Sequence, residues 1–192
     1  ASLAGFGNVI TNEVESLIEN GSTVMTGGDV TLSSFDSSSI RSLGLSIAAS
    51  GGASLSGMVG YNEISNIVRS QVAGSTVDAD SLIETAESDS DILSFVAGVS
   101  ASGAIAAQLS LSVNDIENVV EASIVNEGTQ RSDVDVAQGV SVSASDHSTV
   151  DAIAVGVSAS GTVAGGAAIA QSTIANTVAT AITQSDIDAV AG

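Results

Sequence analysis

The chain has 192 residues, and the 44% that are apolar suffice to bury a core. Its 22 carboxylates face only three arginines and no lysine, so the formal net charge is −19, which excludes binding to nucleic acid or to an anionic membrane through a basic face. The absence of cysteine excludes disulfides and thiolate metal sites, and no stretch approaches the roughly 18 uninterrupted apolar residues of a membrane-spanning helix, so we expect no membrane insertion.

The sequence repeats itself along its whole length. A block of the form Ile-x-Asn-x-Val-x-small-x-Ile/Val occurs four times, and its asparagines are 54, 52 and 58 residues apart: Asn12, Asn66, Asn118 and Asn176. A Ser-Gly pair recurs between the blocks, with its glycine at Gly51, Gly103 and Gly161. Fixed internal spacing is the signature of a tandem array. We divide the chain into the end of one repeat (1–29), a repeat (30–81), a repeat with a longer loop (82–139) and an incomplete repeat (140–192).

Each repeat begins with a short segment that is predicted to be a strand, such as Val30 to Ser33. A polar segment rich in Asp and Ser follows it. These side chains readily bond to their own backbone, so we expect turns at 36–38, 89–91 and 146–148.

Two segments with an alternating pattern flank each Ser-Gly pair. In the first complete repeat, Leu43, Leu45 and Ile47 alternate with small residues before the glycine, and a similar alternation follows it. A period of two predicts two strands joined at a corner glycine. The small residues would let another layer approach closely, so we expect both faces of these strands to be covered. The apolar parity changes at Asn62-Glu63, where we expect a corner or bulge.

The Ile-x-Asn-x-Val block ends the repeat, and its apolar spacing fits a helix and a strand alike. Glu13, Glu15 and Arg69 fall on the parity opposite to the apolar row, as a strand with one buried face requires. We therefore interpret the block as a strand. Variation in repeat length is confined to the polar segment 126–138, which we expect to be a surface loop.

Four or five strands per unit, joined by short turns and repeated in tandem, predict an all-β chain. The expected architecture is a β-solenoid (β-helix) or a stacked β-fibre made of units of about 54 residues. The pattern leaves open whether one unit forms one wide coil or two narrow ones, and whether a filament contains one chain or several.

The chain resembles the repeat regions of large filamentous adhesins of Gram-negative bacteria, the filamentous haemagglutinin-like and leukotoxin-like exported proteins. The resemblance rests on the segment Gly28 to Ser34, the Ala-Ser-Gly centre of each repeat and the Asn-x-Val-x-Ser-x-Ile end, and it covers nearly the whole chain. It implies a secreted, β-helical, adhesive or biofilm-forming protein. The run 154–161 is also similar to the heads of trimeric autotransporter adhesins, although those repeat in much shorter units.

Candidate site residues are few. The single histidine, His147, has no positioned acid–base partner in the pattern and is expected to be a solvated turn residue, so the chain is expected not to be an enzyme. The weak calcium candidates are Asp89, Asp91, Asp133 and Asp135. The nonapeptide of calcium-binding β-rolls is missing, so we expect a solvated acidic edge and no cofactor.

The four repeated asparagines lie on the apolar parity, and a buried amide needs hydrogen-bond partners. Stacked coils would supply these partners as a structural ladder, amide to amide along the fibre. The alternative is an asparagine at a corner that bonds its own turn. The residues concerned are Asn12, Asn66, Asn118 and Asn176.

The expected function is a structural or adhesive segment of an extracellular or cell-surface fibre of a bacterium. Its expected partners are neighbouring repeats, other copies of the chain in a homo-oligomer or filament, and a host or matrix surface. Two alternatives remain, a polysaccharide-binding or polysaccharide-processing β-helix and a trimeric autotransporter-type adhesin. The first would carry aromatic or basic sugar platforms, which are scarce in this sequence.

Overall fold

The computed structural model describes residues 1–189, of which no residue is helical, and 83% of the chain is strand. The strands are β1 (Ser2–Ile10), β2 (Glu13–Ile18), β3 (Thr23–Met25), β4 (Val30–Ser50), β5 (Ala53–Ile64), β6 (Ile67–Ala73), β7 (Thr76–Ser102), β8 (Ile105–Ile116), β9 (Val119–Val125), β10 (Asp133–Ser160), β11 (Val163–Ile174), β12 (Thr177–Ile182) and β13 (Asp186–Ala189). Within this described range there is accordingly no helix that could cross a membrane. The expectation of an all-β chain is confirmed.

The strands form three parallel sheets, in the orders β1-β5-β8-β11, β12-β9-β6-β2 and β13-β10-β7-β3, with β4 also paired to β7. Every strand pairs with its counterpart in the next repeat. Val30, Leu82 and Val140, for example, occupy one column across β4, β7 and β10. One repeat therefore makes one wide turn of the chain, which we call a circuit, and successive circuits stack in register.

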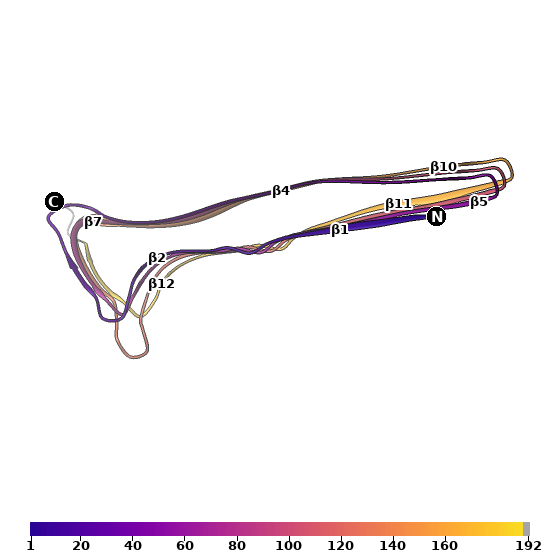
Figure 1. Ribbon diagram of the computed structural model, residues 1–192. Helices are drawn as coiled ribbons and strands as arrows, with labels where there is room; N and C mark the ends of the chain where they lie inside the picture. The colour runs from indigo at the N-terminus through magenta and orange to yellow at the C-terminus, as the bar shows by residue number, and fades with distance from the viewer. Residues whose placement is uncertain (190–192) are drawn as a thin grey trace.

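Figure 1 shows that each circuit has two parts of different shape. At one end the chain follows a triangle, made by β2 and its counterparts, by the short strand β3 and its counterparts, and by the first halves of β4, β7 and β10. At the other end it is a long, narrow, two-layered arm, in which the second halves of β4, β7 and β10 face β1, β5, β8 and β11. We call these parts the triangular end and the blade; the blade comprises residues 1–8, 42–62, 94–114 and 152–172.

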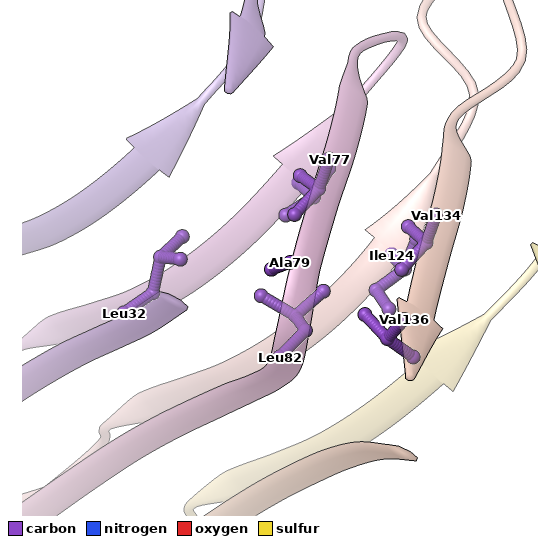
Figure 2. Packing of buried hydrophobic residues seen from close by; sticks show 8 residues of the cluster. Leu32, Val77, Ala79, Leu82, Ile124, Val134 and Val136 are labelled. Atoms are coloured by element: carbon purple, nitrogen blue, oxygen red, sulfur yellow. The ribbon is translucent and has the colours of Figure 1, made fainter. Parts of the chain in front are cut away.

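The triangular end encloses an aliphatic core. Figure 2 shows Val77, Ala79 and Leu82 on β7, and beside them Ile124 of β9 with Val134 and Val136 of β10, which belong to the next circuit. Val77, Leu82, Ile124 and Val134 are completely buried. Columns of branched side chains of similar size stack well on a parallel sheet that is covered on this face.

The Ile-x-Asn-x-Val block turns inward with the predicted parity. Ile64, Val68 and Val72 are completely buried, whereas Arg69 between them points outward to Glu15 and Glu121. The interpretation as one strand is wrong, however, because the block spans two strands with a corner between them. β5 ends at Ile64 and β6 begins at Ile67, so the asparagine lies at the corner.

The expected turns at 36–38, 89–91 and 146–148 are absent from the described structure. These residues continue the long strands β4, β7 and β10, which run without interruption past them. Every second residue faces inward here: Asp36 is only 5% exposed, and Ser88 and Ser90 are fully buried. The prediction of turns is wrong because the inward polar side chains at this place form hydrogen bonds with asparagines across the circuit and do not need water.

In the blade, the small side chains face inward and the large apolar side chains face outward, the reverse of the arrangement expected of two packed strand layers. The small residues of Gly44-Ser46-Ala48 face inward, and Leu43, Leu45 and Ile47 face outward with 77, 57 and 60% of their surface exposed. Only one face of each blade strand is therefore covered within the chain. The change of apolar parity at Asn62-Glu63 is no corner or bulge, since β5 runs straight through it. It marks the place where large residues change from outward, in the blade, to inward, in the triangular end.

The expected long loop is shorter than predicted. Residues 126–132 leave the circuit and are joined by a bridge between Glu127 and Gln130, but Asp133 already begins β10. Val134 and Val136 are buried beside Val77 and Ala79, and a register shift between Val136 and Gly139 absorbs the remaining length difference. The prediction of a surface loop holds for 126–131 and fails for Ser132, which is fully buried, and for 133–136.

Candidate functional site

The four corner asparagines form a ladder along the stack. The side-chain oxygen of each accepts a hydrogen bond from the backbone N–H of the asparagine one circuit before it, at 3.0 Å from Asn12 to Asn66, 3.1 Å from Asn66 to Asn118 and 2.8 Å from Asn118 to Asn176. The ladder is thus amide to backbone, and it lies at the corner. Each carboxamide oxygen satisfies a peptide N–H that the bend removes from the sheet.

The amide nitrogens of the same asparagines point across the circuit to the long strand. Asn12 and Asn66 both donate to the carboxylate of Asp36, at 2.8 and 2.7 Å, and Ser38 donates to it at 2.8 Å. Asp146 occupies the same column two circuits on and accepts from Asn118 and Asn176. The middle circuit has Ser88 and Ser90 here, and both accept from Asn118. This polar contact closes the triangular end and fixes the distance between the two layers.

A second asparagine ladder lies inside the base of the blade, and the sequence interpretation missed it. Asn8 donates to the side-chain oxygen of Asn62 at 2.8 Å, and Asn62 donates to that of Asn114 at 2.7 Å. These bonds run amide to amide along the stack, and Asn62 and Asn114 are fully buried. Asn62 and Asn114 follow their corner glycines at the same distance, and this repeated spacing indicates a second column of asparagines. The change of apolar parity beside them indicates a bulge instead, which the described structure does not contain at this place.

The corner glycines lie at the tip of the blade, between β4 and β5 and at the two equivalent places. A Cβ at Gly103 would collide with the carbonyl oxygen of Gly51, and a Cβ at Gly161 would collide with that of Gly103. Glycine is required here by the close approach of successive circuits, since none of the three has a positive φ.

Hydroxyl groups hold the two layers of the blade together. Ser56 donates to the Oγ of Ser46 at 3.0 Å, Ser100 donates to Ser54 at 2.9 Å, and Ser94 and Ser112 share a bond of 2.9 Å. The few larger inward side chains sit opposite glycine: Phe6 and Met58 fill the space above Gly44, and Gln108 fills the space beside Gly98 and Gly156. The interior of the blade is therefore thin and largely polar, and it buries little apolar surface.

The outside of the blade carries the large apolar side chains instead. In the middle circuit, which has neighbours on both sides, Phe95, Ile105 and Leu109 are still 37 to 53% exposed. This exposure is a property of the sheet face and does not come from an unpaired edge. A hollow of about 200 Å³ is formed over Gly57 on the outside of β5 by Leu3, Leu55, Val59 and Leu109.

Glu84 is the one buried acidic group without a partner that the described residues contain. It occupies the column between Leu32 and Val142, it is completely buried, and neither carboxylate oxygen has a hydrogen-bond partner. Burial disfavours the charged form of the carboxyl group and raises the pKa of Glu84 to about 8. At neutral pH this side chain is therefore protonated.

The calcium candidates do not converge. Asp89 and Asp91 lie on the outer side of β7, and Asp91 accepts from Thr149 at 2.8 Å. Asp133 and Asp135 lie at the start of β10, where Asp135 is stacked between Asp78 and Asp188. No group of three or more His, Cys, Asp or Glu side chains suited to a metal ion occurs within 1–189. His147 is exposed and lies in the same column as Asp89.

Comparison of the chain with protein-family models, with curated proteins and with solved structures gave no match.

Proposed function

We propose that the chain is a segment of a β-solenoid that serves as a structural, adhesive fibre or stalk on the outside of a bacterial cell. The observation that carries this proposal is the register of the strands. All three sheets continue from circuit to circuit in parallel, so every circuit offers the next a complete row of backbone donors and acceptors. An object built in this way grows along one axis without a natural limit.

End-to-end joining of copies is part of the proposal. In this chain β1, β2 and β4 have one free edge, and so do β10, β11 and β12 at the opposite end of the stack, apart from the short pairing of β10 with β13. A free parallel edge pairs with any strand of matching length and register, and a further circuit of the same architecture has both. A heterologous contact of this kind extends the stack without closing it.

The non-catalytic role and the extracellular location rest on the sequence. The absence of cysteine, the charge of −19 and the resemblance to filamentous adhesins support them. The Asn and Ser side chains inside the blade and at the corner support a mechanical role, since they join successive circuits and the two layers of the blade. Adhesion to a host or matrix surface would then use the outward-facing columns of the stack.

Imaging by negative stain, combined with X-ray diffraction from aligned samples, tests the proposal. We expect fibres of uniform width with a meridional reflection at about 4.8 Å, the spacing of strands along the stack. Compact particles that do not lengthen with concentration, with no such reflection, would contradict it. Binding of purified polysaccharides by those particles would favour the alternative of a polysaccharide-processing β-helix.

A further inference from the structure

The charges of this chain are divided sharply between its two parts. The blade contains no Asp, Glu, Arg, Lys or His at all, so the 22 carboxylates and three arginines lie at the triangular end and at the base of the blade. The outer faces of the blade meanwhile expose the large apolar side chains. A continuous apolar face of this kind on a soluble protein marks a contact surface.

We propose that the outer face of β4, β7 and β10 in the blade, which we call the front face, docks on the front face of a second copy of this chain. The front face consists of the outward residues of 43–50, 95–102 and 153–160, among them Leu43, Leu45, Ile47, Phe95, Ile153, Val155 and Val157. The two copies lie side by side with their stacking axes parallel.

The spacing of the face selects a second copy over an unrelated protein. Outward side chains recur about every 6.6 to 7 Å along a strand and about every 4.8 Å along the stack. Leu43, Phe95 and Ile153 form one such column, and Ile47, Val99 and Val157 form another. Only another parallel stack carries ridges with the same two spacings, so only such a partner can interdigitate along the whole face.

Hydrocarbon is a poorer partner for the same face. In the blade, β4 leaves a row of backbone groups unpaired along its free edge, and β10 leaves another at the opposite end of the stack. A lipid interior satisfies none of these groups, which is why open sheets do not occur there. Docking on a second blade leaves both the tip and the edges in contact with water.

Repulsion between the acidic ends fixes the orientation of the pair. The blade segment 42–50 is about 30 Å long at about 3.3 Å per residue. If the two blades point in opposite directions, the triangular ends are separated by roughly this length, which exceeds a Debye length of about 8 Å at physiological salt. If the blades point the same way, the two acidic ends lie side by side. The opposed arrangement is an isologous contact with its two-fold axis parallel to the stack.

The area of the face sets the strength of the contact. Eight residues per circuit present about 125 Å² in projection, so three circuits present about 400 Å². A stable interface buries about 800 Å² per partner. Three circuits therefore associate weakly and in a concentration-dependent way, and the contact strengthens in longer stacks because every circuit adds to it.

Sedimentation velocity over a series of concentrations tests the contact. The variant Leu45→Lys/Val155→Lys places two lysines on one column of the front face, and Ser33→Lys/Ser143→Lys places two on one outward column of the triangular end of the same strands. Both variants change the net charge equally and reduce repulsion between copies. We expect the blade variant to weaken association at least tenfold and the control variant to leave it unchanged or strengthen it. Equal effects of the two variants overturn the proposal.

Three further measurements distinguish docking between copies from misfolding of the variants and from binding to lipid. Thermal melting of both variants shows whether they fold, and the expected melting temperatures match that of the unmodified chain within a few degrees because all four positions face outward. Raising the salt concentration should strengthen association, since it screens the acidic ends and favours apolar contact. Flotation with phosphatidylcholine vesicles, by a chain that stays monomeric in buffer, would make a lipid surface the occupant and overturn the proposal.

Cysteine pairing tests the orientation, because the chain has no cysteine of its own. Phe95→Cys lies near the base of the front face, and Ala101→Cys lies near its tip. In an oxidised mixture of the two variants, we expect mixed disulfides to predominate. Predominant homodisulfides would overturn the opposed orientation. The end-to-end joining proposed above uses strand edges and not the front face. The blade variant should therefore lose lateral contact and still form fibres of unchanged length, so the two proposals can fail separately.

Discussion

At the scale of the residue, Glu84 occupies an unfavourable position. Its column neighbours Leu32 and Val142 are apolar, and its carboxyl group is buried without a partner. A carboxyl group in such a place is tolerated only because it stays protonated. The charge of the unfolded chain and that of the folded chain therefore differ over a wide range of pH.

This difference predicts how stability depends on pH. The pKa of Glu84 rises from 4.5 to about 8 on folding, so between these values the folded chain holds one proton more than the unfolded chain. The free energy of unfolding must then fall by roughly 1.4 kcal/mol per pH unit as pH rises through this window, and the loss is complete above it. We expect Glu84→Leu to remove this slope in urea unfolding from pH 5 to 8 and to stabilise the chain by ~3 kcal/mol at pH 7. Glu87→Leu, on the outward side of β7, is the control; equal slopes in both variants would refute the prediction.

The side chain of Asn66 makes two kinds of hydrogen bond. Its oxygen accepts from the backbone N–H of Asn12, and its nitrogen donates to the carboxylate of Asp36. Asn66→Ala leaves the backbone N–H of Asn12 without its acceptor and the buried carboxylate of Asp36 short of one donor. We expect a loss of about 2 to 4 kcal/mol in the free energy of unfolding, measured with urea. Gln138→Ala, which removes an exposed amide, should change it by less than about 0.5 kcal/mol. Similar values for both would show that the corner does not depend on the amide.

At the scale of the element, the tip of the blade is limited by the approach of one circuit to the next. Gly103 faces the carbonyl group of Gly51, whereas nothing lies within 4 Å of a Cβ built on Gly52. The position of Gly52 is already occupied by Ala104 in the next circuit, which shows that a side chain fits there.

Substitution of alanine for Gly103 and for Gly52 should therefore have opposite effects on stability. We expect Gly103→Ala to lower the free energy of unfolding by about 1 to 3 kcal/mol, because the circuits must separate locally to admit the methyl group. Gly52→Ala should be neutral or stabilise the chain by up to about 1 kcal/mol, by restricting the unfolded state. Thermal melts in parallel measure both. Equal destabilisation would mean that backbone conformation, and not contact between circuits, requires glycine at the tip.

At the scale of the whole molecule, stability comes from stacking. An isolated circuit has no partner for its strand edges, and its blade interior buries mostly Ser, Gly and Ala. Ordering costs about 1.5 kcal/mol per residue, which the apolar residues of one circuit do not offset.

Chains of one, two, three and four circuits should accordingly show melting temperatures that rise with circuit number. Self-association should increase in the same order. Calorimetry and light scattering measure the two quantities. A single circuit that melted as cooperatively and as high as four circuits, and stayed monomeric, would contradict the role of stacking.

Much of this architecture could be predicted from the sequence. The repeat spacing, the all-β character, the inward parity of Ile64, Val68 and Val72 and the corner glycines all follow from local pattern, because period, branching and small size act within a single strand. The tertiary structure decided which side of each blade strand is inside. Leu43 and Gly44 alternate in either orientation, and only the close packing of a second layer, bonded through serines, turns the small side inward. It also decided that Asp36 lies in a strand and not a turn, since the asparagines that satisfy it come from other places in the sequence, 24 and 30 residues away.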